Sequence, residues 1–174
     1  MHDATLSLFR PIRLLLLDVD GVLTDGTIFY TEAGAETKAF NVKDGLGIRM
    51  LMRAGIEVGI VTGRTSAALT RRCRELGISL IYDSVPDKSA LLEEILSRIR
   101  IKADQVAFMG DDLPDIPLLK KVGLAIAVAD AHPAVRESAR FVTTAPGGHG
   151  AVREICENIL HARDLWHQAT QKFL

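Results

Sequence analysis

The chain alternates short apolar runs with longer stretches in which apolar residues recur every three or four positions. Short continuous apolar runs are typical of strands buried on both faces, and the longer period is that of a helix with one buried side. Strands are predicted over 12–17, 56–61, 78–82, 105–109, 124–128 and 141–143. Helices are predicted over 44–54, 65–76, 87–99 and 113–121, with a short one from Pro133 and a long one from about Ala151. This alternation favours an α/β fold of three layers, a parallel sheet with helices on both faces.

One segment departs from the alternation. Residues 27–31 and 36–40 are two β-type runs about a turn that contains Gly34, which predicts a β-hairpin flap over about 25–42. The hairpin carries four large apolar side chains: Ile28, Phe29, Tyr30 and Phe40. These are too many for an isolated solvated flap, so we expect the hairpin to pair with copies from other subunits.

Composition fits one domain over 1–174, because 174 residues that are 48% hydrophobic and 25% charged suffice for a sizeable core. The net charge of −1, without a run of five like charges, gives no reason to expect nucleic-acid or membrane-surface binding. The longest apolar run near the N-terminus, Leu14 to Leu17, is far shorter than the roughly 20 residues that span a bilayer. Residues 1–11 lack the apolar region of a secretory signal. We therefore expect a cytoplasmic protein.

Two carboxylates two residues apart, Asp18 and Asp20, follow the first predicted strand directly. Side chains alternate along a strand, so both can emerge on the same side as the chain leaves the sheet. The carboxyl ends of strands are where open α/β sheets bind ligands. Two like charges so close need a cation, a shared proton or a bound phosphate. A turn or helix cap is the ordinary alternative for such a pair standing alone.

Three further polar signals stand at strand ends or helix starts. Thr62-Gly63 can offer a hydroxyl and backbone N–H groups to phosphate oxygens. Lys88 lies at a helix start, where the helix dipole disfavours a cation unless an anion is near. Another predicted strand is followed by three carboxylates: Asp111, Asp112 and Asp115. With the first acidic pair they form an oxygen-rich set of the kind that suits Mg²⁺.

In this order the four motifs resemble those of the haloacid dehalogenase superfamily of phosphatases. Segments 41–49, 128–133 and 147–154 are similar to the 3-deoxy-D-manno-octulosonate 8-phosphate phosphatases of that superfamily, so the resemblance covers nearly the whole chain. It implies a Rossmann-like fold without a cap domain, and a homotetramer in which neighbouring chains complete the active site. It also implies hydrolysis of 3-deoxy-D-manno-octulosonate 8-phosphate in lipopolysaccharide precursor synthesis. His149 departs from the pattern, because many members carry Arg in that glycine-rich turn.

The resemblance implies a role for each motif. Asp18 would attack phosphorus to give an aspartyl-phosphate. Asp20 would protonate the leaving sugar oxygen and then deprotonate the water that hydrolyses the intermediate. Thr62 and Lys88 would hold the phosphoryl oxygens.

The metal site implied by the resemblance is built from carboxylates. Mg²⁺ would be held by the Asp18 carboxylate, the Asp20 backbone carbonyl and Asp111. Asp112 and Asp115 would orient water ligands or the neighbouring lysine.

A substrate that is a small acidic sugar phosphate calls for guanidinium groups, which bind carboxylates in a planar fork. The candidates are Arg49, Arg64 and Arg72, and Arg64 matches the octulosonate phosphatase pattern, whereas related nonulosonate phosphatases tend to carry Glu there. The residues expected to contact the substrate are Asp20, Asn41, Val42, Lys43, Asp44, Gly45, Arg49, Thr62, Gly63, Arg64, Arg72 and Lys88.

Two other interpretations stay open. One is a phosphatase for a related acidic sugar phosphate, such as a nonulosonate 9-phosphate. The other is a catalytically silent oligomerisation module, like the phosphatase-like domain attached to some sialic-acid-activating enzymes, although the intact Asp18, Asp20, Lys88 and Asp111 argue against it. If the chain is itself monomeric, we expect the C-terminal tail, residues 164–174, to cover the substrate in place of the hairpin.

Overall fold

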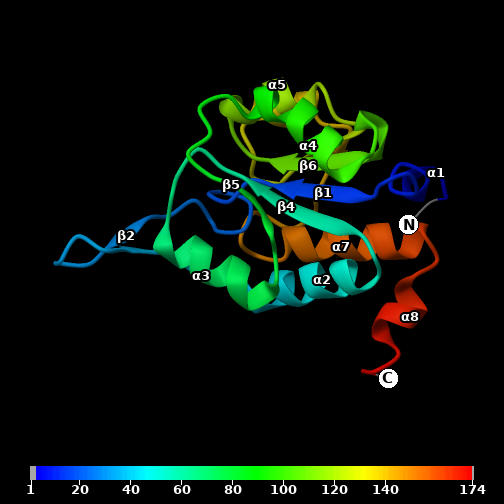
Figure 1. Ribbon diagram of the computed structural model, residues 1–174, viewed down its shortest axis with the longest axis horizontal. Helices are drawn as coiled ribbons and strands as arrows, with labels where there is room; N and C mark the ends of the chain where they lie inside the picture. The colour runs from blue at the N-terminus through cyan, green and yellow to red at the C-terminus, as the bar shows by residue number, and fades with distance from the viewer. Residues whose placement is uncertain (1–2, 174) are drawn as a thin grey trace.

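A computed structural model describes residues 3–173 and places a parallel sheet at the centre of the molecule (Figure 1). The strand order is β5-β4-β1-β6-β7-β8, and every neighbouring pair is parallel. The strands are β1 (Leu14–Leu17), β4 (Glu57–Val61), β5 (Leu80–Tyr82), β6 (Val106–Gly110), β7 (Leu124–Ala127) and β8 (Phe141–Val142). Each predicted strand is present, and its ends lie within two residues of the predicted ends.

Helices cover both faces of the sheet. In Figure 1, α2, α3 and α7 lie below it, and α4 and α5 lie above it, which confirms the three predicted layers. The helices are α1 (Asp3–Leu6), α2 (Val42–Arg53), α3 (Ala67–Leu76), α4 (Leu92–Ile99), α5 (Ile116–Leu119), α6 (Pro133–Ser138), α7 (Ala151–Ala162) and α8 (Trp166–Thr170). None of these described helices has the length and apolar character needed to cross a membrane.

The central strand β1 explains why the site forms where it does. Its four leucines are fully buried, because β4 and β6 flank it and helices cover both its faces. The chain leaves β1 for β4 and β5 on one side and then returns to β6 on the other. The helices that follow β1 and β6, α2 and α5, lie on opposite faces (Figure 1). Such a reversal opens a crevice at the carboxyl ends of the two strands.

The predicted hairpin is confirmed, with shorter strands than the sequence suggested. Strand β2 (Phe29–Tyr30) pairs antiparallel with β3 (Glu36–Thr37), and the ribbon projects from the body of the molecule (Figure 1). Phe29 and Tyr30 are 54% and 66% exposed. A two-stranded ribbon alone is marginally stable in water, so within one chain the hairpin depends on contacts with the body.

Two predicted helices begin as 3-10 turns. The helix predicted over 87–99 starts as η1 (Lys88–Leu91) and continues as α4, and the one over 113–121 starts as η3 (Leu113–Asp115) and continues as α5. Another such turn, η2 (Ala103–Gln105), precedes β6. Pro114 and Pro117 lack the N–H group that a regular helix would use, which favours short turns in the second case.

The sequence pattern missed α1 and α8. Helix α8 lies in the segment expected as a tail, and it packs against α2 and α7. The Trp166 ring stacks on His161 with their centroids 4.5 Å apart. Helix α8 is therefore packed on the chain's own body.

The loop after β1 and the turn over residues 147–150 touch each other at glycines. A Cβ atom on Gly147 would lie 1.8 Å from the carbonyl oxygen of Gly21. The Gly147 N–H group donates to Asp130 Oδ1 at 2.9 Å, and the Gly148 N–H group donates to the Val22 carbonyl at 2.9 Å. The turn over residues 147–150 is thus packed on the loop that follows the first acidic pair.

We expect Gly147→Ala to lower the melting temperature by about 5–10 °C, because the methyl group would overlap backbone atoms of the loop after β1. Gly55→Ala is the control, since its φ of +80° is strained for alanine but its surroundings are open. The control should lose only about 2–4 °C. Thermal unfolding followed by circular dichroism measures both, and a Gly147→Ala protein as stable as the parent would contradict this packing.

Candidate active site

The crevice at the carboxyl ends of the strands holds a cavity of about 510 Å³. Its walls carry carboxylates, two cationic side chains and a hydroxyl group. Nine predicted site residues line it: Asp18, Asp20, Thr62, Gly63, Arg64, Lys88, Asp111, Asp112 and Asp115. The structure therefore brings all four sequence motifs together in one place.

Lys88 lies among the buried charges of this cavity. Its Nζ atom is 2.9 Å from Asp18 Oδ1 and 2.6 Å from Asp115 Oδ1. Asp87 caps the 3-10 turn η1 by accepting from the Ser89 N–H group, which sets the direction of the chain at Lys88. Burial acts to lower the pKa of Lys88, but the two facing carboxylates outweigh it, and the pKa is raised. Lys88 therefore stays an ammonium group despite its burial.

Both oxygens of Asp115 are already engaged. Oδ1 accepts from Lys88, and Oδ2 accepts from the N–H groups of Asp111 at 2.9 Å and Asp112 at 3.4 Å. Asp115 thus holds the lysine and the loop after β6 in a fixed relation. This geometry supports the prediction that Asp115 orients Lys88.

Three carboxylates lie close enough together to hold a metal ion, and of these Asp18 and Asp111 are the two that could bind it, because Asp115 is already engaged. Carboxylate oxygens of Asp18, Asp111 and Asp115 lie within 4.8 Å of one another. Burial and the charge of Asp115 raise the pKa of Asp18 to about 6, against the lowering effect of Lys88. Burial, followed by the neighbouring carboxylates, raises the pKa of Asp111 to about 8. Within residues 3–173 the Asp111 carboxylate accepts no hydrogen bond, so this oxygen-rich, anion-crowded set fits Mg²⁺.

Gly21 allows the loop after Asp20 to approach the Asp111 carboxylate closely. Its φ is +86°, a conformation that glycine adopts readily and other residues rarely do. A Cβ atom there would lie 2.0 Å from Asp111 Oδ2. The close approach of the first and fourth motifs therefore requires glycine at this position.

Thr62 follows β4 and faces the same cavity. Its N–H group donates to the Tyr82 carbonyl at 2.9 Å, which joins the ends of β4 and β5. Its Oγ1 atom accepts from the Arg64 N–H group at 3.4 Å, so the hydroxyl proton is available to a bound anion. This suits the predicted contact with a phosphoryl oxygen.

Sequence reasoning missed Lys38 and Glu36, two hairpin residues that reach the site. Lys38 forms an ion pair with Asp20, and Glu36 forms an ion pair with Arg64. The only sequence signal was a charged pair on a ribbon otherwise marked by apolar residues. Spacing along the chain does not reveal that the ribbon folds back onto Asp20.

Several residues predicted to bind substrate lie outside this cavity. Val42, Lys43 and Arg49 are exposed on α2. The Arg72 side chain donates to the Asn41 carbonyl at 3.4 Å and lies 6.0 Å from the centre of the Phe40 ring. Their contact with substrate stays a prediction.

Other members of the predicted set form a joint between helices. Asn41 caps α2 by accepting from the Lys43 N–H group at 2.8 Å. Asp44 is buried, which raises its pKa, and its Oδ1 atom accepts from the Arg153 N–H group at 2.7 Å, joining α2 to α7. Gly45 follows on the same buried turn. The structure gives these residues a packing role within the chain, and substrate contact is untested.

His149, which stands where many members carry Arg, is exposed, and its Nδ1 atom lies 2.7 Å from the Gly147 carbonyl oxygen. The ring is therefore held by its own turn.

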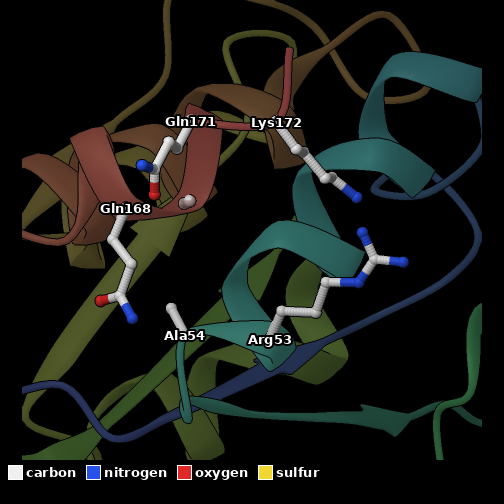
Figure 2. Close-up of a pocket in the computed structure, with 6 residues that line it drawn as sticks. Arg53, Ala54, Gln168, Gln171 and Lys172 are labelled. Atoms are coloured by element: carbon white, nitrogen blue, oxygen red, sulfur yellow. The ribbon is translucent and has the colours of Figure 1, made fainter. Parts of the chain in front are cut away.

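A second hollow of about 510 Å³ lies between the end of α2 and α8 (Figure 2). Figure 2 shows the cationic ends of Arg53 and Lys172 on one side of it and the amide groups of Gln168 and Gln171 on the other. Its described lining residues include no carboxylate, thiol or imidazole. It therefore lacks the carboxylates that gather in the crevice.

Known proteins are similar to this chain in sequence. A family model for haloacid dehalogenase-like hydrolases matches residues 80–155. The chain is 48% identical over 159 residues to the 3-deoxy-D-manno-octulosonate 8-phosphate phosphatase of Yersinia pestis, which covers 91% of this chain and 85% of that protein. It is 49% identical over 152 residues to the phosphatase of the same name from Escherichia coli K12, covering 87% and 81%.

Solved structures share the fold. The 3-deoxy-D-manno-octulosonate 8-phosphate phosphatase from Moraxella catarrhalis, in complex with a magnesium ion, a phosphate ion and a KDO molecule, matches with a TM-score of 0.96 at 40% identity over the whole of both chains. The Yersinia pestis phosphatase matches with a TM-score of 0.92 at 46% identity, covering 95% of this chain and 89% of that one. The chain therefore belongs to the 3-deoxy-D-manno-octulosonate 8-phosphate phosphatase family of haloacid dehalogenase-like hydrolases.

Proposed function

We propose that this protein is a Mg²⁺-dependent phosphatase that hydrolyses 3-deoxy-D-manno-octulosonate 8-phosphate to the free sugar acid and inorganic phosphate. The observation that carries the proposal is the buried Asp18, Lys88 and Asp115 group beside Asp111, in a chain 48% identical to a phosphatase of that name. A site of this composition suits attack on a phosphate ester at neutral pH. Its place in lipopolysaccharide precursor synthesis stays a prediction.

Asp18 is the nucleophile of the proposed reaction. Lys88 fixes its Oδ1 atom, and a pKa of about 6 leaves the carboxylate mostly ionised at pH 7. Attack on phosphorus breaks the bond to the sugar oxygen and forms an aspartyl-phosphate. Water then attacks that phosphorus, which restores the carboxylate and releases phosphate.

Lys88 and Thr62 hold the phosphoryl group. The ammonium group is fixed on two sides by carboxylates, so it offers positive charge to phosphoryl oxygens without having to reorganise. The Thr62 hydroxyl donates to another oxygen from the end of the neighbouring strand. Both contacts gain strength as charge shifts within the transferring group.

Asp20 moves the proton in both steps. It donates to the leaving sugar oxygen and then accepts from the attacking water. When bound by the carboxylates of Asp18 and Asp111 and the backbone carbonyl of Asp20, Mg²⁺ would offset the repulsion between an anionic nucleophile and a phosphate dianion. Asp112 is exposed and lines the cavity, and in this proposal it would orient water at the metal site.

Arg64 supports the choice of an acidic sugar. Its guanidinium group lines the cavity while 46% of the side chain stays exposed, which leaves it open to a substrate carboxylate. Turnover of the eight-carbon acid phosphate measured against a nonulosonate 9-phosphate decides between the two substrates. Faster turnover of the nine-carbon compound would replace the proposed substrate and keep the chemistry.

We further propose that the protein forms a homotetramer and works in the cytoplasm. The exposed hairpin residues Phe29 and Tyr30 support assembly, because a single chain leaves them in water. The two free, buried cysteines, Cys73 and Cys156, suit a reducing compartment.

Replacing the nucleophile tests the chemistry. Asp18→Asn should lower phosphate release by about 10³-fold or more, because an amide cannot form the aspartyl-phosphate. Asp104→Asn, a carboxylate outside the cavity, is the matched control and should keep parental activity. An Asp18→Asn protein that retains most of its activity, with deamidation excluded by mass spectrometry, would remove Asp18 from this role.

The response to Mg²⁺ should depend on pH. Asp18 and Asp111 have folded-state pKa values of about 6 and 8, both above the ordinary 3.8 of the unfolded chain. Their contribution to stability is therefore full below about pH 4 and is lost as pH rises through 6 and then 8. Because Mg²⁺ binds the ionised carboxylates, its effect on melting temperature should grow between pH 6 and pH 8.5.

Differential scanning fluorimetry at both pH values, with and without Mg²⁺, measures this effect. Asp111→Asn cannot ionise and should remove most of the difference between the two pH values. An equal Mg²⁺ shift at pH 6 and pH 8.5 in the parent would contradict the assignment of these carboxylates.

Polar substitution of the hairpin tests assembly. The double variant Phe29→Ser and Tyr30→Ser should reduce the molecular mass in solution and lower kcat/KM for the sugar phosphate by about tenfold or more, since the site would lose its cover. Hydrolysis of p-nitrophenyl phosphate should fall less. Val142→Ser, an exposed apolar residue of β8, is the control. Light scattering that finds the parent monomeric would end this part of the proposal.

A further inference from the structure

A closed ring of four charged side chains ties the hairpin to the crevice. The Lys38 ammonium group contacts Asp20 Oδ1 and lies 3.0 Å from Glu36 Oε1. Arg64 Nη2 lies 2.8 Å from Glu36 Oε2, and Arg64 Nε lies 3.6 Å from Asp20 Oδ2. Each carboxylate thus has one oxygen on each cation. The ring contains two positive and two negative groups and balances its own charge.

The two cations of the ring differ in burial. The Lys38 side chain is 1% exposed, whereas the Arg64 side chain is 46% exposed. Exposed ion pairs contribute little to stability, whereas the loss of one partner from a buried pair is strongly destabilising. Lys38 is therefore a fixed part of the ring, and Arg64 remains free to exchange Glu36 for a substrate carboxylate.

Asp20 needs an orienting contact. It lies on a loop, its side chain is 21% exposed, and its carboxylate must reach the leaving oxygen within hydrogen-bond distance. A catalytic group that is displaced by about 1 Å can lose about a hundredfold in rate. Lys38 is the buried contact to its carboxylate, and Glu36 holds Lys38 from the other side.

We propose that Lys38 is a positioning residue for Asp20, which it orients from the hairpin toward the leaving oxygen of the substrate. The inference rests on the proposed function for the role of Asp20. Lys38 acts through that carboxylate and is not among the residues that line the cavity, which separates its role from that of Lys88.

The proton transfer defines what Lys38 supports. As the bond between phosphorus and the ester oxygen breaks, its electron pair stays on that oxygen, and the Asp20 proton moves there. The Asp20 carboxylate later takes one proton from the water that attacks the aspartyl-phosphate, so the acid is regenerated. A leaving group that is unstable as an anion depends on the proton transfer from Asp20, whereas a leaving group that is stable as an anion does not.

Comparison of two leaving groups tests the inference. Departure of a sugar alkoxide needs the Asp20 proton, whereas p-nitrophenolate leaves without it. Lys38→Met should lower kcat for 3-deoxy-D-manno-octulosonate 8-phosphate by about 10–100-fold with KM within about threefold. It should change kcat/KM for p-nitrophenyl phosphate by less than about threefold, because that ratio reports only the steps up to leaving-group departure.

Three further proteins make the result specific. Lys120→Met, an exposed lysine outside the ring, should behave like the parent on both substrates. Asp20→Asn should show the same selective loss as Lys38→Met, and the double variant should lose little more. Lys38→Cys alkylated to S-aminoethylcysteine restores an ammonium group and should recover the kcat for the sugar phosphate, while Cys73 and Cys156 are protected by burial.

The inference would be overturned by an equal loss of kcat/KM on both substrates or by additive losses of kcat in the double variant. A rise in KM with kcat unchanged would overturn it as well. If Lys38→Met does not fold, Glu36→Gln removes one contact of Lys38 and should give a smaller loss of the same selectivity. Should the parent not accept the sugar acid phosphate, the substrate assignment fails, and ribose 5-phosphate serves as the alkoxide probe. Failure of the substrate assignment is thus visible in the parent alone, apart from the result for Lys38.

Discussion

The ammonium group of Lys88 is the contact on which the site depends. It links the end of β1, through Asp18, to the loop after β6, through Asp115. Without it, crowded carboxylates at these two strand ends would face one another inside the protein. Loss of one partner of such a buried pair typically destabilises by about 3–5 kcal/mol. The parallel sheet brings the strand ends together, and this charge holds them there.

Much of the fold was predictable because buried parallel strands and one-sided helices have distinct apolar periods. The six core strands and the hairpin follow from that pattern. The details that differ depend on local hydrogen bonds and on contacts distant in sequence. Pro114 and Pro117 shorten the helix after β6 into a turn and a single short helix. Helix α8 forms against α2 and α7, and its own sequence reads as a polar tail.

The site was predictable to the extent that strand ends meet. Asp18, Thr62, Lys88 and Asp111 converge because each of them follows a strand of one parallel sheet or starts the helical turn after it. Lys38 was not predicted because the alternation of apolar and polar residues within a hairpin does not reveal where the hairpin packs on the rest of the chain. Asp44 matched the family pattern expected to contact substrate, yet within this chain it joins α2 to α7. Sequence order alone does not distinguish a residue that faces a ligand from one that packs beneath it.

The packing of residues 147–150 on the loop after β1 has a consequence for how the molecule reaches its native state. The hydrogen bond from Gly148 to Val22, and the one from Arg153 to Asp44, join segments more than a hundred residues apart. During synthesis β1 and its aspartates emerge first, but these two contacts form only after nearly the whole chain has been made. Contacts of such long range slow folding. The loop after β1 and the start of α2 therefore gain these contacts only once residues 148–153 have been made.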